Sequence, residues 1–290
     1  MKNSFSRFSL LLLILLLCVA ACRRVVEEKE GNIAPSYINA LWATDTLWDD
    51  GLAEVAVYDA EREVYGRTRD FEYTFILVKE DFNQAYNVKT DDYSREDLFP
   101  VMKVNKFARI PTQKYPYHYL SSLFFKREAP NTLHKMTQSS QEWCGNTFKL
   151  FEHTGDHYRY EYTSYWDGQG DGEMQLPDTL WFEDALSYTL RALRFEVGLT
   201  FDQTVLESQV TNSAPEPKVY QAQFKVSEDE TVLSDTVRPA WRVEAQLEEG
   251  KTNTYWFAKE YPNILLKQQS WDGRNMELKS ATREAYWAVE

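Results

Sequence analysis

The stretch Arg69–Phe82 reads RDFEYTFILVKEDF, and its hydrophobic residues alternate with a period of two. On an extended chain, one face carries Phe71, Tyr73, Phe75 and Leu77, and the other carries Glu72, Thr74, Ile76 and Val78. This pattern is typical of a β-strand that buries one face. The second face is the more polar at its start, so we expect that end of the strand to have one side in water.

The same alternation recurs along most of the chain. It is found in Leu52–Tyr58, Val101–Ile110, Tyr117–Phe125, His157–Trp166, Val219–Val226, Trp241–Leu247 and Asn253–Ala258. Glycine beside Asp or Asn separates several of these segments, and tight hairpins need the positive backbone angles that glycine adopts. Short strands with turn residues between them predict an antiparallel meander. The motif SWDGRN predicts a hairpin from Ile264 to Leu278 around Asp272 and Gly273.

One segment, Leu180–Leu193, departs from this pattern. Ala185, Leu186, Thr189, Leu190 and Leu193 recur at helical spacing, with Asp178 or Thr179 as the cap. A single amphipathic helix among strands has to bury its apolar stripe, most simply inside the curve of the sheet. The predicted fold class is therefore mostly β: a curved antiparallel meander, an open or half barrel, with one amphipathic helix packed on its concave side.

The first residues have the pattern of an export signal. Lys2 and Arg7 precede the apolar run Phe8–Leu17, which is too short to span a membrane. The run ends in CVAAC, where small residues precede Cys22 in a way that resembles the lipobox of bacterial lipoproteins. We therefore expect residues 1–21 to be a lipoprotein signal peptide and Cys22 to be the acylated first residue. The alternative is an ordinary secretory signal that happens to hold a cysteine.

These expectations set the domain organisation and the location. Residues 22–36 are charged and end in Asn, Pro and Ser, which suits a tether from the membrane. Residues 37–290 are then one β-rich domain, with a subdivision near 211–218, around Pro215 and Pro217, as the alternative. The partner predicted first is the membrane, through lipidated Cys22. Arg23 after the cysteine favours an outer membrane lipoprotein that faces the periplasm or the cell surface.

The charge of the chain argues against nucleic-acid binding. The formal net charge is -13, and loss of Lys2 and Arg7 with the signal leaves 30 basic against 45 acidic residues, or about -15. An acidic surface repels phosphate backbones. We expect no nucleic acid among the partners, and a lipid, a glycan or an envelope protein instead.

Cys144 is the one cysteine left after Cys18 in the signal and Cys22. A nucleophilic thiol needs a nearby histidine, and all four histidines lie between His118 and His157. The prediction preferred here is a small buried thiol under Trp143. His153 and His157 flank one turn, but zinc needs three or four ligands. The sequence therefore predicts no metal and no cofactor.

Acidic pairs and known motifs do not indicate an enzyme either. Glu183 with Asp184 is expected to be a solvated helix N-terminus, where negative charge suits the helix dipole. Phosphate-binding glycine loops, a Gly-x-Ser-x-Gly elbow and paired Cys-x-x-Cys motifs are absent from the sequence.

Aromatic residues supply the candidate binding residues. Such stripes can stack on sugars or line a lipid cleft, or can simply hold a sheet together as cross-strand pairs. The candidate ligand-binding residues are Tyr117, Tyr119, Trp143, Tyr158, Tyr160, Tyr162 and Trp166.

Four segments carry a resemblance to a family. YPYHYLSSLFF, SSQEWCGNTF, DGQGDGE and YWFAKEYPNILLKQQSWDGRNMEL resemble motifs of an uncharacterised Bacteroidota envelope lipoprotein family, some members of which are labelled septum formation inhibitor Maf. The resemblance implies a curved antiparallel periplasmic domain of unknown function. We expect a non-enzymatic lipoprotein that binds an apolar or amphipathic ligand or a partner protein. The alternative is a hydrolase acting on glycan or nucleotide.

Overall fold

The computed structural model describes residues 35–214 and 216–288. The predicted signal peptide, Cys22 and nearly all of the tether lie outside the described residues. Ser36–Glu290 forms one compact unit. In chain order its strands are β1 (Ala53–Glu63), β2 (Thr68–Asn83), β3 (Val88–Lys89), β4 (Leu98–Ile110), β5 (Tyr117–Lys126), β6 (Leu133–Gln141), β7 (Asn146–His153), β8 (His157–Ser164), β9 (Asp171–Pro177), β10 (Trp181–Phe182), β11 (Thr200–Leu206), β12 (Val219–Leu233), β13 (Thr236–Glu248), β14 (Lys251–Ala258), β15 (Leu265–Gln269) and β16 (Asn275–Glu284).

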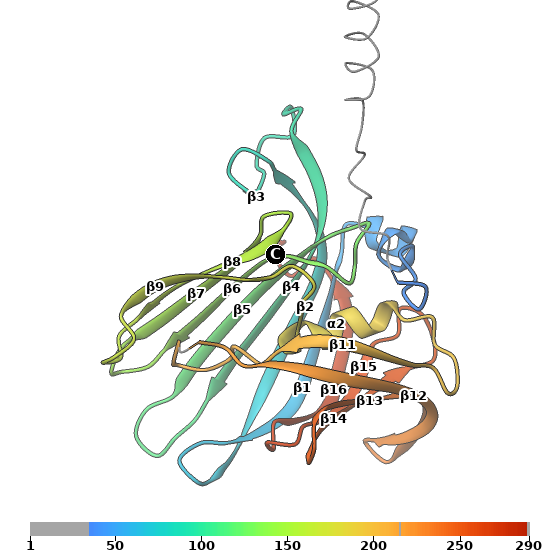
Figure 1. Ribbon diagram of the computed structural model, residues 1–290. Helices are drawn as coiled ribbons and strands as arrows, with labels where there is room; N and C mark the ends of the chain where they lie inside the picture. Colours follow the sequence, from blue (N-terminus) through green and yellow to red (C-terminus); the bar gives the residue numbers. More distant parts are fainter. Residues whose placement is uncertain (1–34, 215, 289–290) are drawn as a thin grey trace, which may run out of the picture. The chain divides into compact units, whose positions relative to one another are not determined.

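All of these strands belong to one sheet (Figure 1). Its order is β10-β11-β12-β13-β14-β15-β16-β1-β2-β4-β5-β6-β7-β8-β9, with β3 beside β2. The first and last strands, β1 and β16, pair in the middle of the sheet, from Ala53↔Glu284 to Glu61↔Asn275. Two halves of the sheet therefore extend from a central seam formed by the two ends of the domain.

The predicted fold class is confirmed. Neighbouring strands are antiparallel except for the parallel contact of β10 with β11, and the terminal strands β9 and β10 do not pair with each other. The sheet is thus open and not closed into a barrel. Each strand predicted from alternation is present, and the hairpin of β15 and β16 turns at Gly273, whose φ is +77°. The sheet curves, and register shifts such as the one between Val57 and Tyr58 increase local twist.

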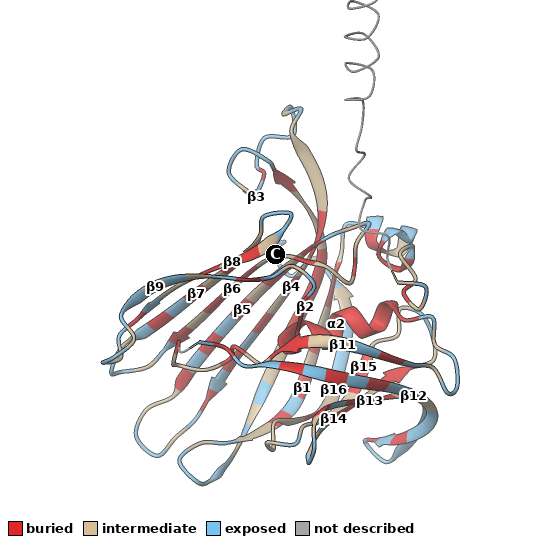
Figure 2. Ribbon diagram, viewed as in Figure 1, coloured by how far each residue is buried: buried red, intermediate tan, exposed pale blue. Residues whose placement is uncertain are grey.

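The predicted helix is shorter than expected and differs in character. Trp181 and Phe182 form β10, a 3-10 turn covers Glu183–Ala185, the α-helix α2 covers only Leu186–Thr189, and a second 3-10 turn covers Leu190–Ala192. Every residue from Leu180 to Leu193 is buried, so this inner segment has no solvent-facing stripe (Figure 2). The prediction of an amphipathic helix was therefore wrong in this respect, because the segment is enclosed on all sides.

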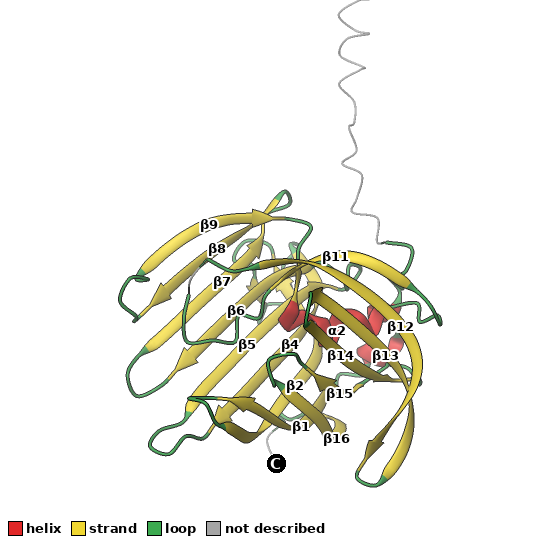
Figure 3. Cartoon of the chain, turned by 60° about the horizontal axis from the view of Figure 1, so that its bottom comes forward, coloured by secondary structure: helices red, strands yellow, loops and turns green. Residues whose placement is uncertain are grey.

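The inner segment, Leu180–Leu193, lies within the curve of the sheet (Figure 3). Phe182 packs against Phe151 of β7, and Trp181 packs against Phe224 of β12, with ring centroids 5.3 and 5.8 Å apart. Arg191 binds Glu54 of β1. Strands of both halves therefore bury their inward side chains against one short segment, which forms the centre of the core.

The connection between β11 and β12 also crosses the concave side. Lys149 Nζ of β7 donates to the Gln209 carbonyl oxygen at 3.0 Å, and Thr147 Oγ1 donates to the Asn212 carbonyl oxygen at 2.8 Å. Side-chain hydrogen bonds, not a strand ladder, therefore link this connection to the far half of the sheet.

Candidate functional site

A cavity of about 60 Å³ lies between the inner segment and the concave face of the sheet. We call it the inner cavity. Its apolar wall includes Phe71, Tyr73 and Phe75 of β2, Ile110 of β4 and Tyr119 of β5. Its polar wall includes three cationic side chains and three carboxylates. This volume has room for a few water molecules or one small polar group, and not for a long acyl chain.

Lys106 is the most deeply buried cation of the inner cavity, with 5 % of its surface exposed. Its Nζ donates to the Asp184 carbonyl oxygen and, at 2.6 Å, to Ser187 Oγ, and it lies 4.4 Å from the centre of the Phe75 ring. Burial lowers the pKa of Lys106 to about 8, because the charged form loses its hydration. The side chain remains mostly protonated at neutral pH.

Arg62 of β1 is the second cation of the cavity wall. Its Nη1 donates to the Val210 carbonyl oxygen at 3.1 Å, and its guanidinium lies 5.4 Å from the centre of the Tyr119 ring. Arg62 Nε is buried and has no hydrogen-bond partner within the described part of the chain. Neither Arg62 nor Lys106 forms a salt bridge with a carboxylate of residues 35–214 or 216–288.

The carboxylates of the inner segment are, by contrast, fully engaged. Glu183 accepts from Arg274 Nη2 at 2.6 Å, from Asn253 Nδ2 at 3.1 Å and from the Ser208 amide at 3.2 Å. Asp184 accepts from Ser208 Oγ at 2.6 Å and from the Gln209 amide at 2.7 Å. Both residues are buried, so the prediction of a solvated acidic pair was wrong.

Two opposing effects act on the pKa of the Glu183 carboxyl group. Loss of hydration raises the pKa of this carboxyl group, while the Arg274 guanidinium acts in the opposite direction. Arg274 also donates from Nε to Asp272 Oδ2 at 2.7 Å. The third cation of the cavity wall is therefore neutralised by carboxylates that lie beside it.

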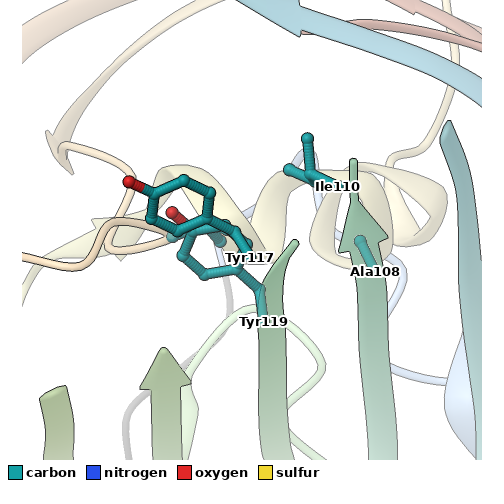
Figure 4. Close-up of a cluster of buried hydrophobic side chains, with 5 residues drawn as sticks. Ala108, Ile110, Tyr117 and Tyr119 are labelled. Atoms are coloured by element: carbon teal, nitrogen blue, oxygen red, sulfur yellow. The ribbon is translucent and has the colours of Figure 1, made fainter. Parts of the chain in front are cut away.

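A group of aromatic side chains lies next to the inner cavity. Tyr119, which lines the cavity, stacks with Tyr117 at 6.1 Å, with 7° between the ring planes (Figure 4). Tyr117 contacts Tyr115, and Tyr115 stacks with Trp143 at 6.0 Å. The hydroxyl of Tyr65 hydrogen-bonds to those of Tyr115 and Tyr117. We call Tyr65, Tyr115, Tyr117 and Trp143 the aromatic rim.

The aromatic rim becomes more exposed with distance from the cavity. Tyr117 is 5 % exposed, whereas Tyr65 is 67 % and Trp143 is 78 % exposed. Ala108, Ile110 and Val210 pack with the tyrosines of β5 in one hydrophobic cluster (Figure 4). A series of aromatic contacts therefore leads from Tyr119 at the inner cavity through Tyr117 and Tyr115 to the exposed Trp143.

The structure places the predicted binding residues in different environments. Tyr117, Tyr119 and Trp143 lie together in the series just described. Tyr158 and Tyr160 are fully buried in the core, where Tyr160 stacks on Phe151 at 4.3 Å and Tyr158 contacts Phe182. Those two tyrosines have no surface available to a ligand in this structure.

Tyr162 of β8 and Trp166 of the following connection lie near β9, which is one free edge of the sheet. The Tyr162 ring lies over Gly172 of β9, at a position where a side-chain carbon would meet its hydroxyl oxygen at 2.3 Å. Trp166 packs against Tyr165 in the connection from β8 to β9. Neither residue lines the inner cavity.

Cys144 lies on the surface, in the turn between β6 and β7. The prediction of a thiol buried under Trp143 was wrong, because Trp143 instead extends toward Tyr115. The adjacent Gly145 is needed for packing, since a side-chain carbon there would lie 2.2 Å from Cγ of Tyr165.

The histidines do not form a metal site. His157 Nδ1 pairs with Asp156 at 2.7 Å, and His153 packs on Tyr158. Within the described ranges, no group of three or more His, Cys, Asp or Glu side chains is placed to hold a metal ion.

Sequence reasoning did not identify Arg62, Lys106 or Lys149 as interior residues. Each is in the buried phase of its strand: Lys106, for example, alternates with Val104 and Ala108 on the inward side of β4. The sequence does hold a signal that could have identified them. In each case a charged residue occupies a position where the alternation requires an apolar one.

Comparisons with known proteins give a distant likeness of fold. No family model matches the chain, and no curated protein matches it. A beta-barrel-like protein of the domain of unknown function DUF1849 from Brucella abortus aligns with a TM-score of 0.46 and 7 % identity, over 80 % of this chain and 98 % of that one. A DUF1089 family protein from Pseudomonas aeruginosa aligns with a TM-score of 0.37 and 15 % identity, over 57 % and 82 %.

Among the residues that the structure describes, no helix has the length and apolar character needed to cross a membrane.

Proposed function

We propose that this chain is an envelope lipoprotein, anchored through acylated Cys22, whose β-rich domain is a non-enzymatic binding protein for an amphipathic ligand. The observation that carries the proposal is the contact between the inner cavity, which has a charged wall, and the aromatic rim, whose outer members Tyr65 and Trp143 are exposed. Binding sites combine apolar walls with a few placed polar groups in this way.

The size of the inner cavity determines which part of a ligand it could hold. The inner segment is buried on the concave side, and the inner cavity beside it has a volume of about 60 Å³. A polar end group fits this space, and Tyr117 and Tyr115 continue outward to Trp143. We therefore place the polar end of the ligand in the cavity and its apolar or ring-shaped part on the aromatic rim, where aromatic side chains provide stacking surface.

Native mass spectrometry of the mature protein, purified gently from its own envelope, tests the proposal. The denatured mass gives the protein with its covalent acyl chains, so any larger native mass belongs to a bound ligand. We expect such a ligand, released on denaturation. A native mass equal to the denatured mass would contradict ligand binding and favour a role through partner proteins.

A pair of variants then locates the ligand. Ala108 is buried and lines the inner cavity, whereas Ala281 of β16 is exposed. Ala108→Leu should fill part of the cavity and lower ligand occupancy severalfold, while Ala281→Leu should retain it. Equal occupancy in the two variants would place the ligand elsewhere.

A further inference from the structure

We propose that the inner cavity is a subsite for an anionic oxygen group, a carboxylate or a phosphate, held between Lys106 and Arg62. This inference rests on the proposed ligand binding and adds the chemical class of the ligand's polar end.

The charge arrangement of the cavity wall supports an anion. Arg274 is neutralised by Glu183 and Asp272, and both oxygens of Asp184 accept hydrogen bonds. The third carboxylate of the wall, Glu61, accepts from Asn275 Nδ2 at 2.8 Å and forms no salt bridge with either remaining cation of the wall. Lys106 and Arg62 have neutral partners instead: carbonyl oxygens, a hydroxyl group and aromatic rings. Two cations without a salt bridge thus face one small space. Because neither cation is held in a salt bridge, an anion that contacts both would be stabilised by charge-assisted hydrogen bonds.

The hydrogen-bond donors of the two cations are only partly used. An ammonium group has three donors and a guanidinium group has five. Lys106 Nζ uses two donors, to the Asp184 carbonyl oxygen and Ser187 Oγ, and Arg62 Nε is buried without a partner in the described chain. Charge-assisted bonds from such donors to an oxyanion are among the strongest hydrogen bonds in proteins.

The apolar wall limits what else the ligand contains. Phe71, Tyr73, Ile110 and Val210 surround the cavity and supply no further charge. A molecule with several charges would have to place some of them against this wall or the aromatic rim. One anionic end followed by an apolar or ring-shaped part fits the series of surfaces from Lys106 to Trp143.

Calorimetric titration of the mature protein in nanodiscs, with empty nanodiscs as the blank, tests the assignment. The probes are octanoate, octyl phosphate, octanol, octylamine and inorganic phosphate. We expect octanoate or octyl phosphate to bind about tenfold or more tightly than octanol and octylamine. Lys106→Met and Arg62→Met should each weaken this binding about tenfold or more, since each removes charge-assisted hydrogen bonds.

Lys149→Met is the matched control. Lys149 is also buried, and burial lowers its pKa to about 8, but it binds Gln209 and Thr211 and does not line the inner cavity. Its replacement should leave the affinity for octanoate unchanged. If Lys106→Met does not fold, reductive methylation of the unmodified sequence replaces it: octanoate should protect Lys106 and not Lys149, as located by peptide mass mapping.

The outcomes separate this inference from the proposed function. Octanol or octylamine binding as tightly as octanoate, or equal affinities for Lys106→Met and Lys149→Met, would overturn the anion subsite and leave ligand binding intact. Inorganic phosphate binding as tightly as octyl phosphate would support the subsite and contradict an amphipathic ligand. Absence of binding by every probe, with a bare protein in native mass spectrometry, would overturn both.

Discussion

Glu54 and Arg191 form a buried ion pair between β1 and the inner segment. Their oxygens and nitrogens meet in two hydrogen bonds of 2.7 and 2.8 Å, and both side chains are less than a tenth exposed. Arg191→Met should lower the free energy of unfolding by about 3–5 kcal/mol, because it leaves Glu54 buried without a partner. Urea denaturation followed by tryptophan fluorescence measures this change.

The double replacement and an exposed pair serve as controls. Glu54→Gln with Arg191→Met should cost less than Arg191→Met alone, since no unpaired charge remains. Lys218 and Glu248 form an exposed pair, whose loss should cost less than about 1 kcal/mol. If Arg191→Met also lowered the free energy of unfolding by less than about 1 kcal/mol, the carboxylate of Glu54 would have to reach water in the folded protein.

The pKa of Lys106 predicts a dependence of stability on pH. The folded-state pKa is about 8 and the unfolded value is 10.5, so the unfolded chain binds more protons between these values. Stability contributed by this group therefore rises with pH in that window. From pH 7 to 9.5, the free energy of unfolding should rise by about 2 kcal/mol more in the unmodified protein than in Lys106→Met.

Urea denaturation of both proteins at several pH values measures the difference. Lys149→Met should give a similar difference, because its ammonium is buried to a comparable degree. Parallel stability curves for the unmodified protein and Lys106→Met would mean that Lys106 has an ordinary pKa and contacts water.

At the scale of single residues, the sequence predicts burial only where alternation and residue type agree. Tyr117 and Tyr119 of β5 satisfy both conditions, and the sequence identified them as candidate ligand-binding residues. Lys106 is buried because the inner segment supplies an acceptor for its ammonium, and that acceptor is distant in sequence. Cys144 was wrongly expected in the core because its residue type was weighted above its place in a turn.

The elements themselves were predicted best where one face is apolar. β6 was not predicted, because its buried positions include the polar residues Gln138 and Ser140, and Gln138 accepts a hydrogen bond from Ser121 of β5. The inner segment was predicted as one amphipathic helix, since spacing alone does not reveal that its remaining face is also covered. Tertiary packing also allows Trp181 and Phe182 to pair with β11 instead of joining a helix.

The hairpin of β6 and β7 provides a prediction at this scale. Gly145→Ala would put a methyl group 2.2 Å from Cγ and 2.7 Å from Cβ of Tyr165, so the turn or the β8 end must shift. The expected cost is about 1–3 kcal/mol of unfolding free energy. Thermal denaturation of Gly145→Ala, with and without Tyr165→Ser, measures it. A cost that persists in the double variant would assign it to the turn's backbone.

The whole molecule was predictable as a class but not as a topology. Alternation indicates strands and a buried face, and it does not say which strands pair. Nothing in β1 or β16 alone specifies that Ala56 lies opposite Ala281. The inner cavity was also not predictable, because residues from both halves of the sheet and from the inner segment form it.

The proposed anchor gives a prediction for the whole protein in its cell. Cys22→Ser should move the protein from the membrane fraction to the soluble fraction, because two or more acyl chains are needed for stable attachment. Immunoblotting of fractionated cells measures the distribution, and Cys144→Ser, which retains Cys22, is the control. A soluble distribution of both the unmodified protein and Cys22→Ser would favour an ordinary secretory signal, and a membrane distribution of both would mean that another feature attaches the protein.

The pairing of β1 with β16 affects how the chain can fold. A ribosome or an export channel delivers β1 more than two hundred residues before its central partner, so one edge of β1 stays without a neighbour throughout delivery. Closing so long a loop is slow, and an unpaired edge can bind another chain in the meantime. The seam at the centre of the sheet can therefore form only after β16 has been delivered, and a chain that stops before Asn275 never completes it.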